Sequence, residues 1–381
     1  MDEYTYKIRR LGDKLVQNYK CNNCKIYNGI NGPYDDPETK VRNLSHLIII
    51  TAIEILKFNK KTYIKDLKLM GSELISLQSS DGIYIMRNKE GKDFCNGVIG
   101  HAWVIEAYVY LFKVFKENHY ITVAEKLCEK HYFNRSLCLW ERPISNKNEE
   151  DIDYTLNHQL WYAASLAELN FYLKNEYFEK QLIEFLNKLQ VNMSVGMHGK
   201  ISHSIYNRTS ILNKTKNNIK KIINNFNEIM NRPSLQYKEQ GYHIFNMMAL
   251  ARLYQLFPEH VFFKSIKFNK TLKYCNTSEL LIGLKNPKIS LDKSLNNKII
   301  NQEEKDLNIY GYPYNVPGFE IMFCKCVFRN KINDQIVNKV MNEQFLLTFD
   351  QDTGFFDLKC HDKYTINYRI YEYYRYLEIE N

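Results

Sequence analysis

The chain has 381 residues, of which 45% are hydrophobic and 25% are charged, and its formal net charge is +9. This length exceeds one ordinary core, so two domains or one large repetitive architecture are needed, and the apolar content excludes intrinsic disorder. Lys and Arg form no stripe with base-reading motifs, so we expect no nucleic-acid partner. The sequence shows neither a signal peptide nor an apolar run of about 18 residues. We therefore expect a cytoplasmic protein without a transmembrane segment.

Two kinds of helix alternate along the chain. Some segments carry a single apolar stripe at helical spacing, which is typical of outer helices with one wet face. These outer helices are expected at residues 3–19, 64–77, 182–189 and 332–341. Other segments are apolar nearly all round and must be enclosed by protein. These inner helices are expected at residues 47–56, 98–112, 160–169, 244–256, 319–328 and 366–377.

Pairing each inner helix with the next outer helix gives six hairpins. The first helix, residues 3–19, is left over to cover the last inner helix and close a ring. The predicted fold is therefore all-α, an (α/α)6 toroid or six-hairpin barrel, with residues 1–381 in one domain and short extended segments in the rim loops. Insertions are expected near residues 207–235 and 286–310. An array of two helical domains is the alternative, because periodicity does not prove closure.

A loose internal repeat favours the ring. At residues 76–86, 192–205 and 347–358, an outer segment ends in a turn and a short extended stretch leads toward an inner helix. Such recurrence indicates one supersecondary unit used several times. The spacing between the copies is uneven, so the additional residues are expected in loops.

Polar residues gather where the inner helices begin. In a toroid these helices run parallel and their N-termini open on one rim, so residues distant in the chain become neighbours. The expected acid and base are Asp93 and Asp153, with Asp36 third. The other expected substrate-binding residues are Glu38, Arg42, Asn96, His101, Trp103, Asn157, His158, Trp161, Tyr242, His243, Glu320, Tyr364 and Asn367.

Each of these residues also has a structural interpretation. A carboxylate that precedes a helix caps free N–H groups and meets the positive end of the helix dipole, which applies to Asp36, Asp93 and Asp153. His101 and His243 lie on apolar helices and fit a buried core equally well. Their coincidence on one rim is what favours a site.

The combination of carboxylates, amides and aromatic rings suits a carbohydrate. Hydroxyl groups need polar partners, whereas the apolar face of a sugar stacks on a ring. Converging helix N-termini favour an anion, so an acidic, uronate-type sugar is expected. Glycosidic cleavage by two carboxyl groups in different environments is the simplest chemistry.

Five segments carry a resemblance to a known family: residues 31–48, 92–103, 155–164, 241–250 and 314–320. They resemble the signature segments of the agl-cluster Q proteins, which are encoded in glycan-assembly gene clusters. The resemblance runs from about residue 31 to the C-terminus. By position, Asp36, Glu38 and Arg42 fall in its first motif, Asp93, Asn96 and Trp103 in its second, and Asn157, His158 and Trp161 in its third.

That resemblance implies a six-hairpin glycosidase-like toroid, similar in shape to unsaturated glucuronyl hydrolases and glucuronyl epimerases. It implies a glycoside hydrolase-like enzyme or sugar epimerase of surface-glycan or glycoprotein assembly. The partner would be a uronate-containing glycan or a lipid-linked oligosaccharide, and no metal or other cofactor is expected. The turn Asp81, Gly82, Ile83 and Tyr84 lacks a Trp, which weakens the analogy to the unsaturated glucuronyl hydrolases.

Two other classes of function stay open. A zinc-dependent toroid similar to the lanthionine cyclases would use cysteine and histidine ligands, and Cys95, Cys324, Cys326, Cys360 and His361 are the candidates. Against it, Cys324 and Cys326 are two residues apart on a helix and face differently. The third class is a non-catalytic glycan-binding scaffold.

Overall fold

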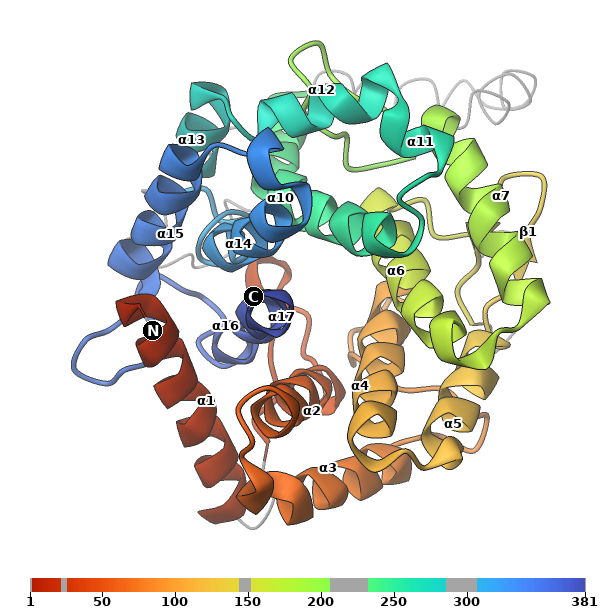
Figure 1. The fold of residues 1–381 in the computed structure, drawn as a ribbon, viewed down its shortest axis with the longest axis vertical. Coiled ribbons are helices and arrows are strands. Elements are labelled where there is room, and N and C mark those ends of the chain that lie inside the picture. Colours follow the sequence, from red (N-terminus) through yellow and green to blue (C-terminus); the bar gives the residue numbers. More distant parts are fainter. Residues whose placement is uncertain (1, 22–25, 144–151, 206–231, 286–306, 381) are drawn as a thin grey trace.

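The structure is a computed structural model that describes residues 2–21, 26–143, 152–205, 232–285 and 307–380. Helices form two concentric layers around a central axis (Figure 1). Strands are confined, within these residues, to one short antiparallel hairpin of β1 (Phe133–Asn134) and β2 (Leu139–Trp140). The predicted all-α toroid is thus confirmed for the described chain, whereas the assignment of residues 1–381 to one domain stays a prediction.

The inner layer contains the helices that the sequence predicts to be enclosed. They are α2 (Val41–Leu56), α4 (Ile99–Phe115), α6 (Leu156–Leu173), α10 (Arg232–Leu256), α14 (Pro317–Phe328) and the pair α16 (Thr365–Tyr368) and α17 (Tyr371–Ile379). Every residue of α4 from Ile99 to Leu111 is buried. Such a helix needs protein on all sides, and here the outer layer covers one side and neighbouring inner helices cover the others.

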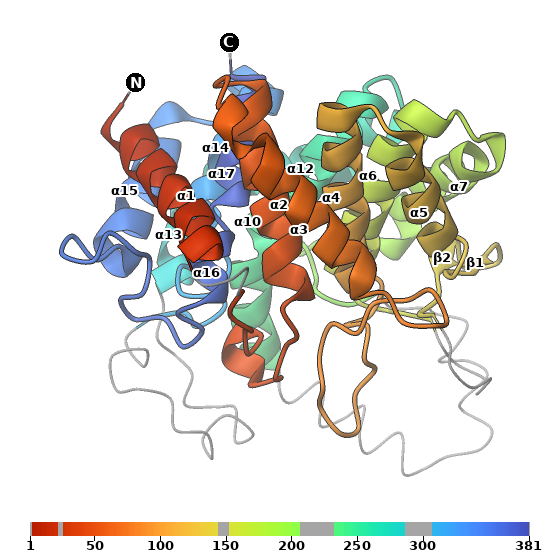
Figure 2. The same cartoon turned by 90° about the horizontal axis from the view of Figure 1, so that it is seen from below.

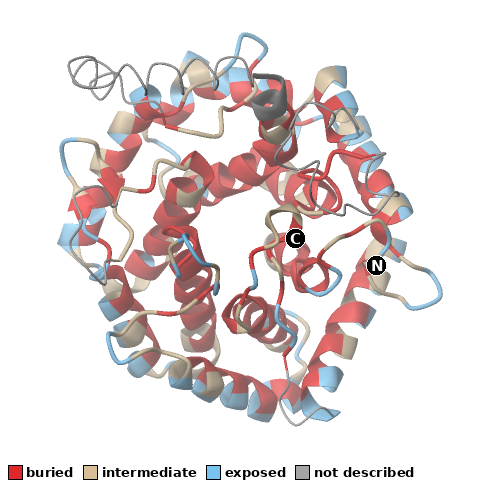
Figure 3. Cartoon of the chain, turned by 180° about the vertical axis from the view of Figure 1, so that it is seen from behind, coloured by how far each residue is buried: buried red, intermediate tan, exposed pale blue. Residues whose placement is uncertain are grey.

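The outer layer contains helices that bury one face (Figure 3). They are α1 (Glu3–Cys21), α3 (Ile64–Ser76), α5 (Asn118–Cys128), α7 (Glu176–Asn192), α11 (Val261–Lys264), α12 (Ile266–Tyr274), α13 (Ser278–Lys285) and α15 (Asp334–Thr348). Single 3₁₀ turns lie at Gly32–Tyr34, Lys61–Tyr63 and Arg329–Lys331. The three short helices α11 to α13 occupy the outer position after α10, where the sequence predicts one partner.

The first helix closes the ring. Thr5 of α1 shares a hydrogen bond of 2.8 Å with the Tyr373 hydroxyl of α17, and Arg9 binds Glu54 of α2. Gly12 permits the close approach of α1 to Tyr374 of α17, because a Cβ at position 12 would lie 2.2 Å from the Tyr374 hydroxyl oxygen. The sequence-based expectation that helix 3–19 covers the last inner helix is confirmed.

The three repeated turns share one geometry. Each is closed by a single antiparallel bridge, which joins Gln78 to Tyr84, Val195 to Ile201, or Phe349 to Phe356. The long rim loops gather at one end of the ring (Figure 2). The predicted insertions at 207–235 and 286–310 lie outside the described residues for most of their length.

Buried ion pairs cross the ring beneath this end. Arg252 of α10 pairs with Glu106 of α4 and with Glu168 of α6, and Arg375 of α17 contacts the same two carboxylates. A buried charge is tolerated when it is paired in this way. The ion pairs therefore fix four inner helices relative to one another. None of the described helices is long and apolar enough to cross a membrane.

Candidate active site

A cavity of about 340 Å³ opens at the end of the ring where the inner helices begin. Residues from α2, α4, α6 and α10 and from the rim loops line it. Nine of the residues expected from the sequence are among them. These nine are Asp36, Asp93, Asp153, Arg42, Asn96, Trp103, Asn157, His158 and Tyr242.

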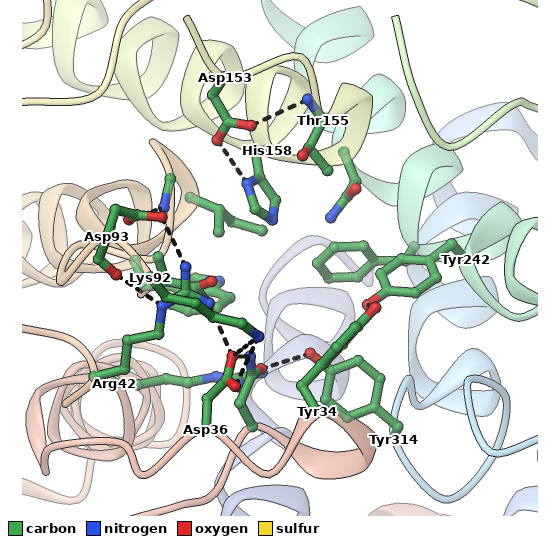
Figure 4. A pocket seen from close by; sticks show the side chains of 18 of the residues that line it. Tyr34, Asp36, Arg42, Lys92, Asp93, Asp153, Thr155, His158, Tyr242 and Tyr314 are labelled. Carbon is green, nitrogen blue, oxygen red and sulfur yellow. Dashed lines mark hydrogen bonds and ion pairs between the residues drawn. The ribbon is translucent and has the colours of Figure 1, made fainter. Parts of the chain in front are cut away.

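Asp36 sits in a cluster of cations on one wall of the cavity (Figure 4). Its side chain is inaccessible to solvent and contacts Arg87 at 2.9 Å, Lys92 at 2.8 Å and Lys89 at 2.6 Å. Burial raises the pKa of Asp36, but the bonds from Lys89 and Lys92 prevail and bring it below its usual value. We call Asp36, Arg87, Lys89 and Lys92 the Asp36 cluster. Its carboxylate is held ionised by charges within the chain.

Asp93 and Asp153 bind consecutive amides before the first turn of α4. The Gly97 N–H donates to Asp93 Oδ1 at 2.7 Å, and the Val98 N–H donates to Asp153 Oδ2 at 3.0 Å. Carboxylates at this position stabilise a helix through its dipole and its free amides. Asp93 therefore binds an amide just before the helix that follows it, whereas Asp153, which precedes α6, binds an amide at the start of the neighbouring helix α4. These contacts bring the two carboxylates together on the cavity wall.

Asp153 also holds an imidazole. His158 Nδ1 lies 2.7 Å from Asp153 Oδ2, and the Thr155 N–H donates to Oδ1 at 3.0 Å. Burial raises the pKa of Asp153, but the charges of His158 and Arg142 and these hydrogen bonds bring it well below its usual range. An ionised Asp153 fixes the proton of His158 on Nδ1 and leaves Nε2 available toward the cavity (Figure 4).

Gly97 makes room for this Asp153–His158 pair. A Cβ at position 97 would lie 1.9 Å from the Asp153 carboxylate and 2.4 Å from His158 Nδ1, and the backbone φ is +64°. Glycine is the residue that tolerates both conditions.

Aromatic side chains form another wall of the cavity. The hydroxyls of Tyr34 and Tyr242 share a hydrogen bond of 2.8 Å, and the Tyr314 hydroxyl donates to Asn31 at 2.8 Å (Figure 4). Phe245 lies beside Tyr242, with ring centroids 6.0 Å apart. Faces of this kind suit the apolar side of a sugar ring.

Several buried polar atoms of the lining have no hydrogen-bond partner within the described residues. They are Asn157 Oδ1, His203 Nδ1, Arg42 Nε and Arg142 Nε. Buried polar groups are nearly always satisfied, so these atoms are available to a ligand in the cavity. Burial and the nearby Lys238 hold the pKa of His203 well below its usual 6.5, so this second imidazole is neutral near pH 7.

Several basic residues of the lining are not among those expected from the sequence, namely Arg87, Lys92, Arg142, His203, Lys238 and Arg369. Most lie in rim loops or turns, where helical periodicity carries no information. His203 could have been found, because it lies in the extended part of the repeated turn at residues 192–205.

Three expected residues anchor the repeated turns outside the cavity lining. His101 Nε2 accepts from the Tyr84 N–H at 3.1 Å, and His243 Nδ1 accepts from the Ile201 N–H at 3.3 Å. Asn367 Oδ1 accepts from the Phe356 N–H at 2.7 Å. In all three cases an inner helix holds the second half of the preceding turn. The recurrence of polar residues at these helix starts thus has a structural cause.

Four more expected residues lie away from the cavity lining. Glu38 binds Arg42 at 3.2 Å and Glu320 binds Arg369 at 2.9 Å, so both support arginines of the lining. The Trp161 ring stacks on Phe245, with centroids 4.5 Å apart. Tyr364 is 52% exposed and stacks on Tyr27.

The cysteines considered as zinc ligands do not assemble with other donors. Within the described residues, no group of three or more His, Cys, Asp or Glu side chains is placed to hold a metal ion. Burial raises the pKa of the Cys95 thiol to about 12, and Cys360 donates to the Leu358 carbonyl. His361 is paired with Asp35.

The same fold occurs in solved structures of carbohydrate-active enzymes. The chain matches a cellobiose 2-epimerase from Bacillus thermoamylovorans with a TM-score of 0.57 and 10% identity, covering 92% of each chain. It matches a polysaccharide lyase with a TM-score of 0.53 and 10% identity, covering 99% of this chain and 98% of that one. Both are six-hairpin toroids, so these matches confirm the predicted fold class.

One relative is closer in sequence. The chain is 27% identical over 360 residues to archaeal glycosylation protein Q of Haloferax volcanii, covering 90% of both proteins. The resemblance to the agl-cluster Q proteins is thereby confirmed. No family model matches the chain.

Proposed function

We propose that this protein is an enzyme of glycan assembly that transfers a proton to or from an acidic, uronate-type sugar, with His158 as the proton-transfer group. The observation that carries the proposal is the Asp153–His158 pair, because a buried carboxylate on Nδ1 leaves Nε2 open beside a polar cavity. A positioned imidazole of this kind is the commonest general acid or base in proteins.

The composition of the lining supports an acidic sugar. Arg42, Arg87, Arg142, Arg369, Lys92 and Lys238 line the cavity, together with the carboxylates of Asp36, Asp93 and Asp153. The six cationic side chains of the lining can donate charge-assisted hydrogen bonds to an anion. The unpaired Asn157 Oδ1 suits a sugar hydroxyl, and the tyrosine wall suits the ring face.

The similarity to a glycosylation protein and to the epimerase and lyase toroids supports the same assignment. In this proposal Asp153 is a positioning residue for His158. Asp93 and Asp36 both pair with Arg87, and Asp36 also pairs with Lys92, so the two carboxylates keep these cations in place.

Exchange of carbon-bound hydrogen tests the proposal. The purified protein would be incubated in D₂O with glucuronate-containing and neutral disaccharides, and NMR would follow deuterium at the sugar carbons. Proton transfer at carbon predicts deuterium incorporation into the glucuronate residue only. Cleavage of the glycosidic bond without any incorporation would instead favour the hydrolysis by carboxylates expected from the sequence. Neither reaction with any acidic sugar would contradict the assignment and favour a scaffold.

A further inference from the structure

We infer that Arg142 binds the carboxylate of the sugar and places the adjacent carbon at His158, so that Arg142 determines the specificity for an acidic substrate. This inference rests on the proposed function and names the group that the cavity recognises. Four arginines line the cavity, and Arg142 differs from the other three in its partners.

The other three arginines are neutralised by carboxylates of the chain. Arg42 pairs with Glu38, Arg87 with Asp36 and Asp93, and Arg369 with Glu320 and Glu372. Arg142 has no ion pair within the described residues, and its buried Nε lacks a hydrogen-bond partner there. Its charge contributes to the lowered pKa of Asp153, but no carboxylate of the described residues forms an ion pair with it. A buried donor without a partner is costly unless a ligand completes it.

The backbone beside Arg142 is held firmly. Gln159 of α6 accepts from the Trp140 N–H at 2.9 Å and donates to the Trp140 carbonyl at 2.7 Å. Glu141 bridges to Ile152, and His131 contacts the Glu141 carbonyl oxygen at 2.9 Å. Arg142 therefore projects from a segment fixed to the helix that carries His158, so the distance between the two side chains is limited by rigid structure.

The chemistry explains why a guanidinium belongs beside the imidazole. When the carbon next to a carboxylate loses its hydrogen, the C–H bond breaks, the proton forms an N–H bond at His158 Nε2, and the electron pair moves into the carboxylate. The resulting enediolate carries two negative charges. A guanidinium fork binds both oxygens of that group and stabilises the developing charge. Return of a proton or deuteron from His158 restores the carboxylate.

A binding experiment with matched sugars tests this inference apart from catalysis. Dissociation constants of glucuronate, its uncharged amide glucuronamide, and glucose 1-phosphate would be measured by NMR titration. The variants would be Arg142→Met and Arg142→Lys. Arg135→Met is the matched control. It also removes one positive charge, but Arg135 is exposed and lies in the turn of the β1–β2 hairpin.

We expect the protein to bind glucuronate more tightly than the other two sugars. Arg142→Met should weaken glucuronate binding by about tenfold to a hundredfold and leave glucuronamide unchanged, as loss of a charged hydrogen-bond pair predicts. Arg142→Lys should restore part of the affinity, whereas Arg135→Met should keep it.

Three results would overturn the inference: no preference for glucuronate over its amide, equal or tighter binding of the phosphate, or full affinity in Arg142→Met. If the Arg142-dependent binding is present but no deuterium enters the sugar, the carboxylate site stands and the proposed proton transfer fails. The two ideas are thus separable.

Discussion

Two walls of the cavity each contain a buried carboxylate beside basic side chains, but the two carboxylates have different partners. In the Asp36 cluster, one inaccessible carboxylate is surrounded by three cations, so its charge is balanced within the chain. In the Asp153–His158 pair, one carboxylate holds one imidazole, and the second ring nitrogen remains available. The first arrangement stabilises a wall, and the second can accept a proton. A carboxylate in a cavity is therefore assigned a role from its partners and not from its type.

Polar residues on the inner helices and in the rim loops have two different uses. His101, His243 and Asn367 each anchor a preceding turn and are satisfied by backbone groups. Asn157, His203 and Arg142 each keep an unpaired polar atom within the described residues and line the cavity. The unpaired group is the one that a substrate can complete.

Removing the imidazole should have the largest effect. His158→Gln keeps a hydrogen-bonding side chain beside Asp153 but cannot take up a proton. We expect hydrogen exchange into the sugar to slow by about 100-fold to 10,000-fold, the usual contribution of a general acid or base. NMR exchange rates measure the change, with the exposed His119→Gln as control. An unaltered rate would remove His158 from the mechanism.

Removing the charge of the Asp36 cluster should reduce stability. Asp36→Asn leaves Arg87, Lys89 and Lys92 close together without their shared counter-ion. We expect the free energy of unfolding to fall by about 3 kcal/mol, as for a broken buried ion pair. Urea titration measures it, and Asp352→Asn on an exposed turn is the control. If Asp36 were instead the catalytic acid, activity would vanish while stability stayed the same.

The Asp153 carboxylate should make stability depend on pH. Its folded pKa lies below its usual 3.8 because the charges of His158 and Arg142 outweigh burial, so its contribution is complete above 3.8 and is lost as the pH falls below that value. Asp153→Asn should cost about 2 kcal/mol near pH 6, and the difference from the unmodified protein should shrink near pH 3. Urea titrations at both values measure this. A constant difference would contradict the ionised pair.

Tyr364 should give the smallest effect. Its ring is 52% exposed and contacts Tyr27 at a centroid distance of 4.7 Å. Tyr364→Ala should lower the unfolding free energy by about 0.5–1 kcal/mol, the worth of an aromatic pair, and leave sugar binding unchanged. Thermal unfolding and NMR titration with glucuronate measure the two quantities. A large loss of affinity would show that Tyr364 binds the sugar, as expected from the sequence.

The helical layers could be predicted because the spacing of apolar residues indicates which faces of a helix are buried. A helix such as α4, apolar on all faces, has to be enclosed, and α1, with one stripe, has to cover something. The same reasoning could not predict three short helices after α10, because that choice depends on how α11 to α13 pack and not on one continuous stripe.

The sequence by itself determined the alternation of enclosed and half-exposed helices and the gathering of polar residues at one rim, because both follow from local spacing. Tertiary structure alone decided which of those residues are satisfied. Asp36 binds Arg87, which lies 51 residues away in the chain, and Asp153 binds His158, which lies 5 residues away. His101 points to a turn, and Arg142 projects into the cavity from a loop that periodicity does not describe. The hydrogen-bond and ion-pair partners of a side chain depend on its position in space, so they are fixed only when the ring closes.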